Sequence, residues 1–244
     1  MADSGGQAVS AISRAYSDRV EVRGRDLTGE LMGRLSFTGY FHLLLTGDEP
    51  TEEQRYFLDL LLVAIAEHGL MPTNVAARMT LAADPESLHG AVAAGILGAG
   101  PVLLGTSEEC ARLLARGGDP KEIVLEYRGA GRKVPGFGHP VHKPVDPRAE
   151  RILELADERG VSGRHVALAR ALREELGLTM NVSMPIAAVL LDLGFPASAA
   201  KAVPILARTA SLLAHLAEER ERPLGLVLAK AAEDAVRYEP DARA

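Results

Sequence analysis

The stretch 136–148 reads Gly136-Phe137-Gly138-His139-Pro140-Val141-His142-Lys143-Pro144-Val145-Asp146-Pro147-Arg148, a glycine-rich turn followed by the start of a helix. The two glycines let the backbone approach a ligand closely. A histidine can gain or lose a proton near neutral pH, and an arginine can hold a carboxylate through two hydrogen bonds. The stretch is therefore suited to proton-coupled chemistry on a small carboxylic acid.

Outward from this stretch, the sequence predicts successive helices that end at glycines. Three begin at the Asp-Pro pairs 84–85, 119–120 and 146–147, where the carboxylate caps the amides and proline fits the first turn. Thr51 begins another and forms a capping box with Gln54. Pro204 is expected to bend its helix or delay its start. No β-branched alternation competes, so the predicted class is all-α. The expected helical ranges are 51–69, 85–98, 106–117, 119–129, 146–160, 164–176, 185–193, 198–219 and 224–237.

The composition excludes several classes of protein. The net charge of −6 argues against nonspecific binding to nucleic acid or to a membrane surface. Cys110 is the single cysteine, which excludes an internal disulfide framework and fits a reducing cytoplasm. We see no secretion leader and no apolar stretch long enough to span a bilayer, so a cytoplasmic location is expected. With 47% hydrophobic residues but 4% aromatic ones, the core must consist of Leu, Ala, Val and Ile, which favours close helix packing.

The motif from Gly136 to Arg148 resembles the central motif of the citrate synthase family. Further matches follow the family's order over roughly residues 30–223 and make the assignment specific. They are Leu43-Leu44-Leu45-Thr46-Gly47 with Pro50-Thr51, Glu67-His68-Gly69 with Pro72-Thr73, Gly100-Pro101, Asn181-Val182, Pro204-Ile205-Leu206-Ala207-Arg208-Thr209-Ala210 with His215, and Glu221-Arg222-Pro223. The version at 67–69 is most similar to citryl-CoA lyase and to the C-terminal part of ATP-citrate lyase.

The resemblance implies a citrate-synthase-like, two-lobed helical fold. A flexible N-terminus would cover 1–24, a large helical domain would combine 25–104 with 205–244, and a small helical domain would span 105–204. Closure between the two lobes would exclude water from the reacting thioester. The family also implies a homodimer.

The resemblance further implies which residues bind and react. His68, His139, Arg148, Arg208 and Arg222 match the histidines and arginines that hold oxaloacetate or the citryl group, with Arg222 reaching into the partner subunit's site. A substrate with several carboxylates needs several fixed cations, because each desolvated charge must be paired. The turn Gly136, Phe137 and Gly138 would lie near the thioester of coenzyme A, which is a substrate here rather than a bound cofactor.

Two catalytic positions of the family differ in this chain. Leu103 stands where the family has a histidine that stabilises the enol of acetyl-CoA, and Ser183 stands where it has the aspartate that acts as general base. A serine hydroxyl is too weak a base to take a proton from a thioester unaided. Acid–base help contributes roughly 10²–10⁴-fold, so activity should fall by about that factor unless another group substitutes.

Three functions follow from this pattern. The first is an enzyme that makes or breaks a carbon–carbon bond between an acyl-CoA and a keto acid, with citryl-CoA cleavage to acetyl-CoA and oxaloacetate as the specific reaction. The second is a regulatory homologue that kept the anion pocket and lost catalysis. The third is a divergent lyase or synthase for another acyl-CoA.

The remaining polar residues have ordinary structural explanations. His42 is expected in the core, His142, His165 and His215 are expected to be structural or exposed, and Arg222 lies in a charged run that could simply be solvated. The seven histidines show no spacing typical of a metal site, so no metal is expected. No glycine loop ends in Lys-Ser or Lys-Thr, so activation of citrate by ATP would require another protein.

Overall fold

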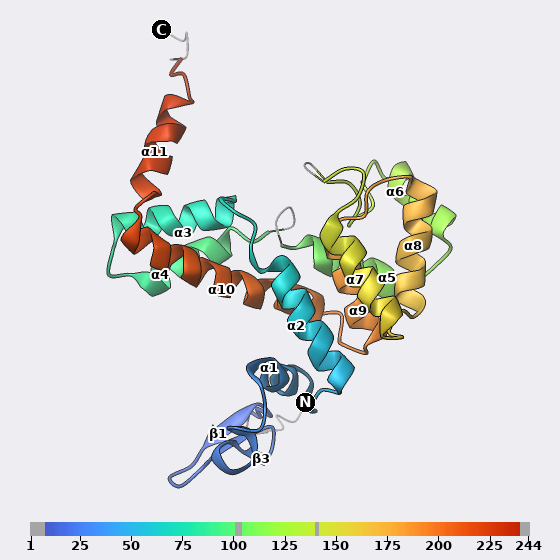
Figure 1. Ribbon diagram of the computed structural model, residues 1–244, viewed down its shortest axis with the longest axis horizontal. Helices are drawn as coiled ribbons and strands as arrows, with labels where there is room; N and C mark the ends of the chain where they lie inside the picture. Colours follow the sequence, from blue (N-terminus) through green and yellow to red (C-terminus); the bar gives the residue numbers. More distant parts are fainter. Residues whose placement is uncertain (1–7, 101–103, 140–141, 240–244) are drawn as a thin grey trace, which may run out of the picture. The chain divides into compact units, whose positions relative to one another are not determined.

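The computed structural model describes residues 8–100, 104–139 and 142–239. Its contacts divide the chain into two compact units, Met1–Asp59 and Leu60–Ala244. Helices dominate both units (Figure 1), so the all-α class is confirmed. In the described part of the chain, no helix combines the length and apolarity that crossing a membrane requires.

The first unit contains a small antiparallel sheet and a short helical layer. Its strands pair in the order β1-β2-β3, and the apolar cluster beneath them contains Val22, Leu31 and Leu43. The elements are β1 (Ser13–Ala15), β2 (Val20–Val22), β3 (Arg25–Asp26), the π-helix η1 (Leu27–Leu31), α1 (Phe37–Thr46) and the first half of α2 (Glu52–Ala66). Thr51 and Gln54 form the expected capping box, since each backbone N–H donates to the other's side chain, at 2.9 and 3.2 Å.

The second unit consists of helices. After α2 come α3 (Pro72–Ala83), α4 (Leu88–Leu97), α5 (Thr106–Arg116), α6 (Pro120–Gly129), α7 (Pro147–Glu158), α8 (Arg164–Leu176), α9 (Ser183–Asp192), α10 (Ala199–Glu221) and α11 (Gly225–Asp234). One group packs around α3, which contacts α4, α10 and α11; in the other, α5, α7 and α8 pack against α9 (Figure 1). Helix α9 is buried without a break from Met184 to Leu190, as expected for a helix that is apolar on every side.

Small residues allow the close packing expected from the composition. A Cβ at Gly95 in α4 would lie 2.7 Å from Leu212 of α10 and 2.9 Å from the carbonyl oxygen of Thr73 in α3. The three helices therefore approach one another so closely at Gly95 that no larger side chain fits there. Ala77, Leu81, Ala91, Leu212 and Leu216 form the buried cluster around it.

Several helix starts match the prediction and one does not. Asp119 and Asp146 cap α6 and α7, accepting from the N–H groups of Lys121 and Arg148 at 2.9 and 3.1 Å. The predicted start at Asp84-Pro85 is wrong. Asp84 instead ends α3, its N–H donating to the Thr80 carbonyl at 3.0 Å, and α4 begins only at Leu88.

The structure also contains elements that the sequence did not predict. Residues 13–15 and 20–22, within the segment expected to be flexible, form strands, while residues 1–7 lie outside the described part. Helix α10 begins at Ala199 and continues past Pro204, so its start is not delayed. The division into a large domain of 25–104 with 205–244 and a small domain of 105–204 stays a prediction.

Candidate functional site

The turn 136–138 is hydrogen-bonded to the segment that leads into α9. The Gly136 carbonyl accepts from the N–H of Asn181 at 2.9 Å, and the Gly138 N–H donates to the Thr179 carbonyl at 2.7 Å. Asn181 also donates its side-chain amide to the Gly138 carbonyl at 3.1 Å. These bonds hold the glycine turn beside Ser183, the first residue of α9, whose N–H donates to the Asn181 side chain at 3.1 Å.

The Gly136 position should not tolerate a side chain. It has φ +81°, and a Cβ there would lie 2.7 Å from Cys110 Sγ and 2.8 Å from Met184 Cβ. We expect Gly136→Ala to lower the free energy of unfolding by about 2–5 kcal/mol through backbone strain and overpacking. Chemical denaturation measures this. Gly129→Ala, where a Cβ meets nothing within 4 Å, is the control, and an equal effect of both substitutions would contradict the packing argument.

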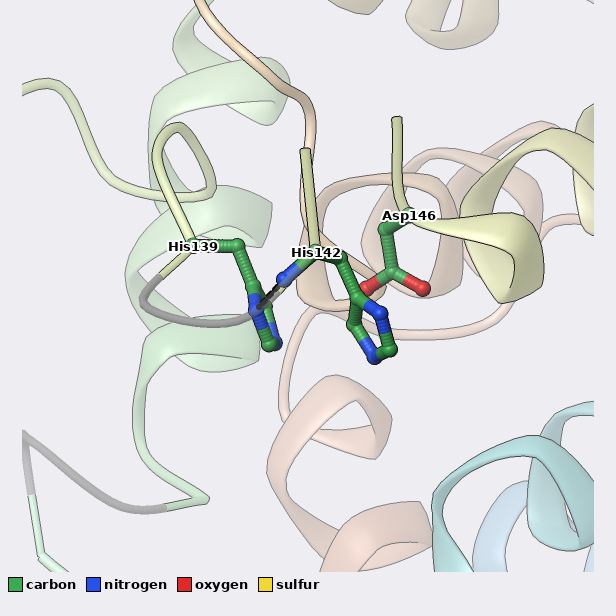
Figure 2. Close-up of side chains that lie close together, drawn as sticks. All are labelled: His139, His142 and Asp146. Carbon is green, nitrogen blue, oxygen red and sulfur yellow. Dashed lines mark hydrogen bonds between the residues drawn. The ribbon is translucent and has the colours of Figure 1, made fainter. Parts of the chain in front are cut away.

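His139 projects from the end of the turn beside His142 (Figure 2). Its Nδ1 accepts the backbone N–H of His142 at 2.8 Å, and the two ring centroids are 4.4 Å apart. Burial, the neighbouring His142 and the charge of Arg148 lower the pKa of His139, against the opposing charge of Asp146. The imidazole is therefore neutral near pH 7, and because its Nδ1 is an acceptor, its proton is on Nε2. His139 offers a hydrogen-bond donor at Nε2.

Arg148 is paired within its own helix start. The fully buried Asp146 accepts from Arg148 Nε at 3.1 Å and from Nη2 at 2.9 Å, and it also accepts from the N–H of Val182 at 3.2 Å. Burial alone would raise the pKa of Asp146, but the hydrogen bonds and charge of Arg148 outweigh it and lower that pKa. Asp146 thus joins α7 to α9 and fixes an arginine that remains one-quarter exposed.

His139, His142 and Asp146 also bring together ligand atoms that lie within 4.8 Å of one another, as a metal site would require (Figure 2). Both oxygens of Asp146 already accept hydrogen bonds from Arg148. A divalent cation would have to displace this guanidinium and would be repelled by it. The donor set therefore fits an ion pair better than a metal ion.

Arg208 is a buried cation without a paired carboxylate in the described part of the chain. Its side chain lies in α10, the residue is 2% exposed, and Nη1 donates to Asn74 Oδ1 at 3.3 Å. The Nε atom has no hydrogen-bond partner. Burial lowers the pKa of Arg208, against the opposing charge of Glu67, which forms no ion pair with it among the described residues. A buried guanidinium is costly unless an anion pairs with it, so this geometry points to a bound carboxylate.

His68 lies in an exposed turn that follows α2. Partial burial lowers its pKa, and so do the charges of Arg148 and Arg208 and, to a smaller extent, His139, against the opposing charge of Glu67. Among the residues expected to bind substrate, Arg148, Arg208 and His139 are therefore the ones that influence the pKa of His68.

Of three further positions singled out in the sequence, the structure describes two. Arg222 is exposed at the C-cap of α10, and within the described residues its side chain makes no hydrogen bond or ion pair with the other four. Ser183 is half-buried and supplies a hydroxyl in place of a carboxylate. Leu103 lies outside the described residues.

Several side chains that hold the His68 turn in place were not predicted from the sequence. Asn74 connects Arg208 to the His68 turn, because its Nδ2 also donates to the Gly69 carbonyl at 2.7 Å. Glu67 accepts hydrogen bonds from the backbone of the same turn. The sequence does contain a signal for the supporting residues of α10, because its polar residues recur at helical spacing and so share one face. They are Arg208, Ser211, His215, Glu218 and Glu219.

Glu67 should make folding stability depend on pH in the acidic range. Burial alone would raise its pKa, but hydrogen bonds from His215, Gly69 and Ser211 lower it from 4.5 to about 2. A depressed folded-state pKa stabilises the protein above the unfolded-state value, and this stabilisation is lost as the pH falls from about 4.5 towards 2.

We therefore expect Glu67→Gln to flatten the fall in the free energy of unfolding between pH 5 and pH 2. Denaturant titrations at several pH values measure this slope. An identical slope in the variant and the wild type would show that Glu67 is not protonated in that range. Glu175→Gln, on the exposed surface of α8, serves as the matched control.

A pocket of about 680 Å³ adjoins the turn and His139. Its lining includes Gly138, His139, Lys143, Arg173 and Thr179. Arg173 is paired with Glu150 at 2.6 Å across the helices α7 and α8. Glu150 and Glu174 also line the pocket, so it combines apolar residues with charges of both signs directly next to the neutral His139.

Comparison with known proteins gives a consistent set of relatives. Residues 7–226 match the family model described as citrate synthase, C-terminal domain. A citrate synthase from Heyndrickxia coagulans is 29% identical over 199 residues, which cover 77% of this chain and 53% of that protein. The chain spans about half the length of the curated relatives it matches.

Two solved structures are similar over nearly the whole chain. Citryl-CoA lyase from Hydrogenobacter thermophilus has a TM-score of 0.88 and 29% sequence identity, and the match covers 97% of this chain and 96% of that one. ATP citrate lyase from Methanothrix soehngenii, solved in complex with citrate and coenzyme A, has a TM-score of 0.82 at 21% identity, covering 99% of this chain and 43% of that one. The second likeness shows the fold alone.

Proposed function

The chain belongs to the citrate synthase family, and from this premise we propose that it makes or breaks the carbon–carbon bond between an acyl-CoA and a keto acid. The specific reaction we propose is the cleavage of citryl-CoA to acetyl-CoA and oxaloacetate. Its support is the likeness to a citryl-CoA lyase that extends over almost the full length of both chains. Coenzyme A enters as the thioester of the substrate.

The observation that carries this proposal is the buried guanidinium of Arg208. Its Nε lacks a partner, and the charges of Arg208 and Arg148 both act on the pKa of His68. A di- or tricarboxylate supplies an anion for the Arg208 guanidinium and further acceptors for the remaining N–H donors. In this arrangement Arg208 binds one substrate carboxylate, and His68 and the exposed edge of Arg148 bind the others.

His139 then acts on the oxygen at the reacting carbon. In bond formation, its Nε2–H hydrogen-bonds to the ketone oxygen and stabilises the negative charge that develops there. In cleavage, a solvent water takes the hydroxyl proton, the carbon–carbon bond breaks, and its electron pair forms the enolate of the acyl-CoA, which then takes a proton from solvent. The same Nε2–H stabilises the alkoxide. With Nδ1 already an acceptor, neutral His139 cannot take the hydroxyl proton itself.

Incubation of the purified protein with citryl-CoA tests the proposed reaction. Oxaloacetate released in the reaction can be followed by coupling to a malate dehydrogenase, and acetyl-CoA by chromatography. We expect equal amounts of both products. Release of free coenzyme A and citrate instead would indicate thioester hydrolysis and would contradict the proposal, as would a folded protein that releases nothing.

A second candidate function is binding without turnover, and Ser183 is the observation that favours it. The only carboxylate shown to reach the start of α9 among the described residues is Asp146, whose oxygens are engaged by Arg148 and Val182. Calorimetry with oxaloacetate, citrate and coenzyme A distinguishes the two functions. Tight binding with no turnover favours a regulatory homologue, and binding with turnover excludes it.

The homodimer is part of the proposal. In a homodimer, the exposed Arg222 would complete the site of the partner subunit. Mixing Arg222→Ala protein with Arg208→Met protein tests this arrangement, because a mixed dimer regains one intact site. We expect the mixture to recover activity that neither variant has alone.

A further inference from the structure

Hydrogen-bonded side chains connect Glu67, the residue before His68, through His215 to Arg78. We propose that His215 is a positioning residue, which couples the buried charge of Arg78 to Glu67 and so fixes the turn that presents His68 to the substrate. This role rests on the proposed function, because it assigns His215 to the binding of the substrate carboxylate by His68.

The Glu67 side chain holds the turn by accepting hydrogen bonds from the backbone of the next two residues. Its Oε1 accepts the N–H of His68 at 2.8 Å and the N–H of Gly69 at 2.6 Å, while Oε2 accepts the Ser211 hydroxyl at 2.9 Å. One carboxylate therefore fixes two consecutive peptide groups and anchors them to α10. Any movement of Glu67 would move the His68 backbone with it.

The geometry sets the tautomer of His215. Arg78 donates from Nε at 3.2 Å and from Nη2 at 2.9 Å to the same ring nitrogen, Nδ1. A guanidinium can only donate, so Nδ1 must carry a lone pair and the proton must be on Nε2. Nε2 lies 3.1 Å from both oxygens of Glu67 and donates to them. Protonation of Nδ1 would place its N–H against the Arg78 donors.

Arg78 is itself held rigidly. It is 1% exposed, and its Nη1 donates to Glu219 at 2.8 Å, with a further ion pair to Glu218. The other oxygen of Glu219 accepts the N–H groups of Leu224 and Gly225 at 2.9 and 2.7 Å. This series of hydrogen bonds thus ends at the junction between α10 and α11. Arg78 is fixed there, and through His215 it fixes the position of Glu67.

The other side of the turn is fixed by Asn74. This amide donates to the Gly69 carbonyl at 2.7 Å and accepts from Arg208 at 3.3 Å. The turn that carries His68 is therefore held from two sides. Asn74 connects it to Arg208, and Glu67 connects it through His215 to Arg78. Binding groups must be held within about half an ångström of their working geometry, and the connection through His215 supplies that constraint for His68.

The first test uses the wild-type protein without any substrate. Two-dimensional ¹⁵N NMR of histidine rings distinguishes the two neutral tautomers and the charged form. We expect the neutral ring of His215 to show a protonated Nε2 and an unprotonated Nδ1, as its hydrogen bonds to Glu67 and Arg78 require. A neutral ring with its proton on Nδ1 would overturn the proposal whether or not the protein cleaves citryl-CoA.

The second test uses variants at the same position. His215→Leu removes the link, and we expect it to weaken oxaloacetate binding or raise KM for citryl-CoA about tenfold, with a smaller effect on kcat. His215→Gln keeps a donor directed at Glu67 and should restore most of that loss. His89→Leu, at an exposed position of α4, is the matched control and should change neither quantity.

A merely structural role would give different results. In that case His215→Leu would lower the melting temperature and leave affinity and KM unchanged, or His215→Gln would be as damaging as His215→Leu. Without ligand, the NMR titration midpoint of His68 should move in His215→Leu and stay in place in His89→Leu. The effects of Glu67→Gln and His215→Leu should be non-additive, because both break the same link, and additive effects would overturn the proposal.

Discussion

Arg208→Met is expected to reduce oxaloacetate affinity about a thousandfold while leaving the fold intact or more stable. The buried guanidinium has an unpartnered Nε, and in the proposed function its principal ion pair is the one with the substrate carboxylate. Loss of a charge-assisted, desolvated pair weakens binding by about 2–5 kcal/mol. Methionine fills a similar volume without the cost of burying a charge, so the free energy of unfolding should stay level or rise.

Calorimetry with oxaloacetate and denaturant titrations measure the two effects of Arg208→Met. Arg220→Met is the control, because Arg220 lies on the same helix but is exposed. A parallel loss of affinity and stability in Arg208→Met would show that Arg208 is a structural residue with an internal partner. Unchanged affinity would remove it from the binding site.

Ser183→Asp is expected to raise turnover by a factor of about 10²–10⁴ if citryl-CoA is the substrate. Ser183 is the first residue of α9, where the helix dipole stabilises a negative charge. The hydrogen bonds from Asn181 hold this helix start beside the glycine turn that precedes His139. A carboxylate at this position would therefore lie next to the reacting carbon and could accept or return its proton.

Ser183→Asn has the same size as the aspartate variant and lacks its charge, so it separates chemistry from shape. The initial rate of acetyl-CoA formation at saturating citryl-CoA measures both variants. Equal rates in Ser183→Asp and Ser183→Asn would show that a general base at this position does not limit the reaction. A lower rate in Ser183→Asp than in the wild type would contradict the assigned place of Ser183 in the site.

The local Asp-Pro signal predicts some helix starts and not others. Asp119 and Asp146 are followed by proline and lie at true helix starts, whereas Asp84, in the same pair, ends α3. Helix α3 was missed because its N-cap is Met71, which makes no side-chain capping bond. The strands of the first unit are two or three residues long, which is too short for alternation to show.

The candidate site likewise contains residues that could be predicted from the sequence and contacts that could not. His68, His139, Arg148 and Arg208 could be named from motifs that resemble one family. The pairing of Arg148 with Asp146 was not predicted, because the same aspartate also serves as a helix cap. Contacts such as that between Arg78 and His215 join residues 137 positions apart. Local patterns carry no information on such a pairing, which depends on how α3 and α10 pack.

The most direct test of the account is the NMR signal of the Arg208 Nε–H group during titration with oxaloacetate. This N–H has no acceptor in the described structure, and the central claim is that a substrate carboxylate supplies one. We expect a saturable downfield shift of this resonance, identified by its absence in Arg208→Met. Oxaloacetate binding that leaves the resonance unmoved, or no binding at millimolar concentration, would show that Arg208 does not bind the substrate carboxylate.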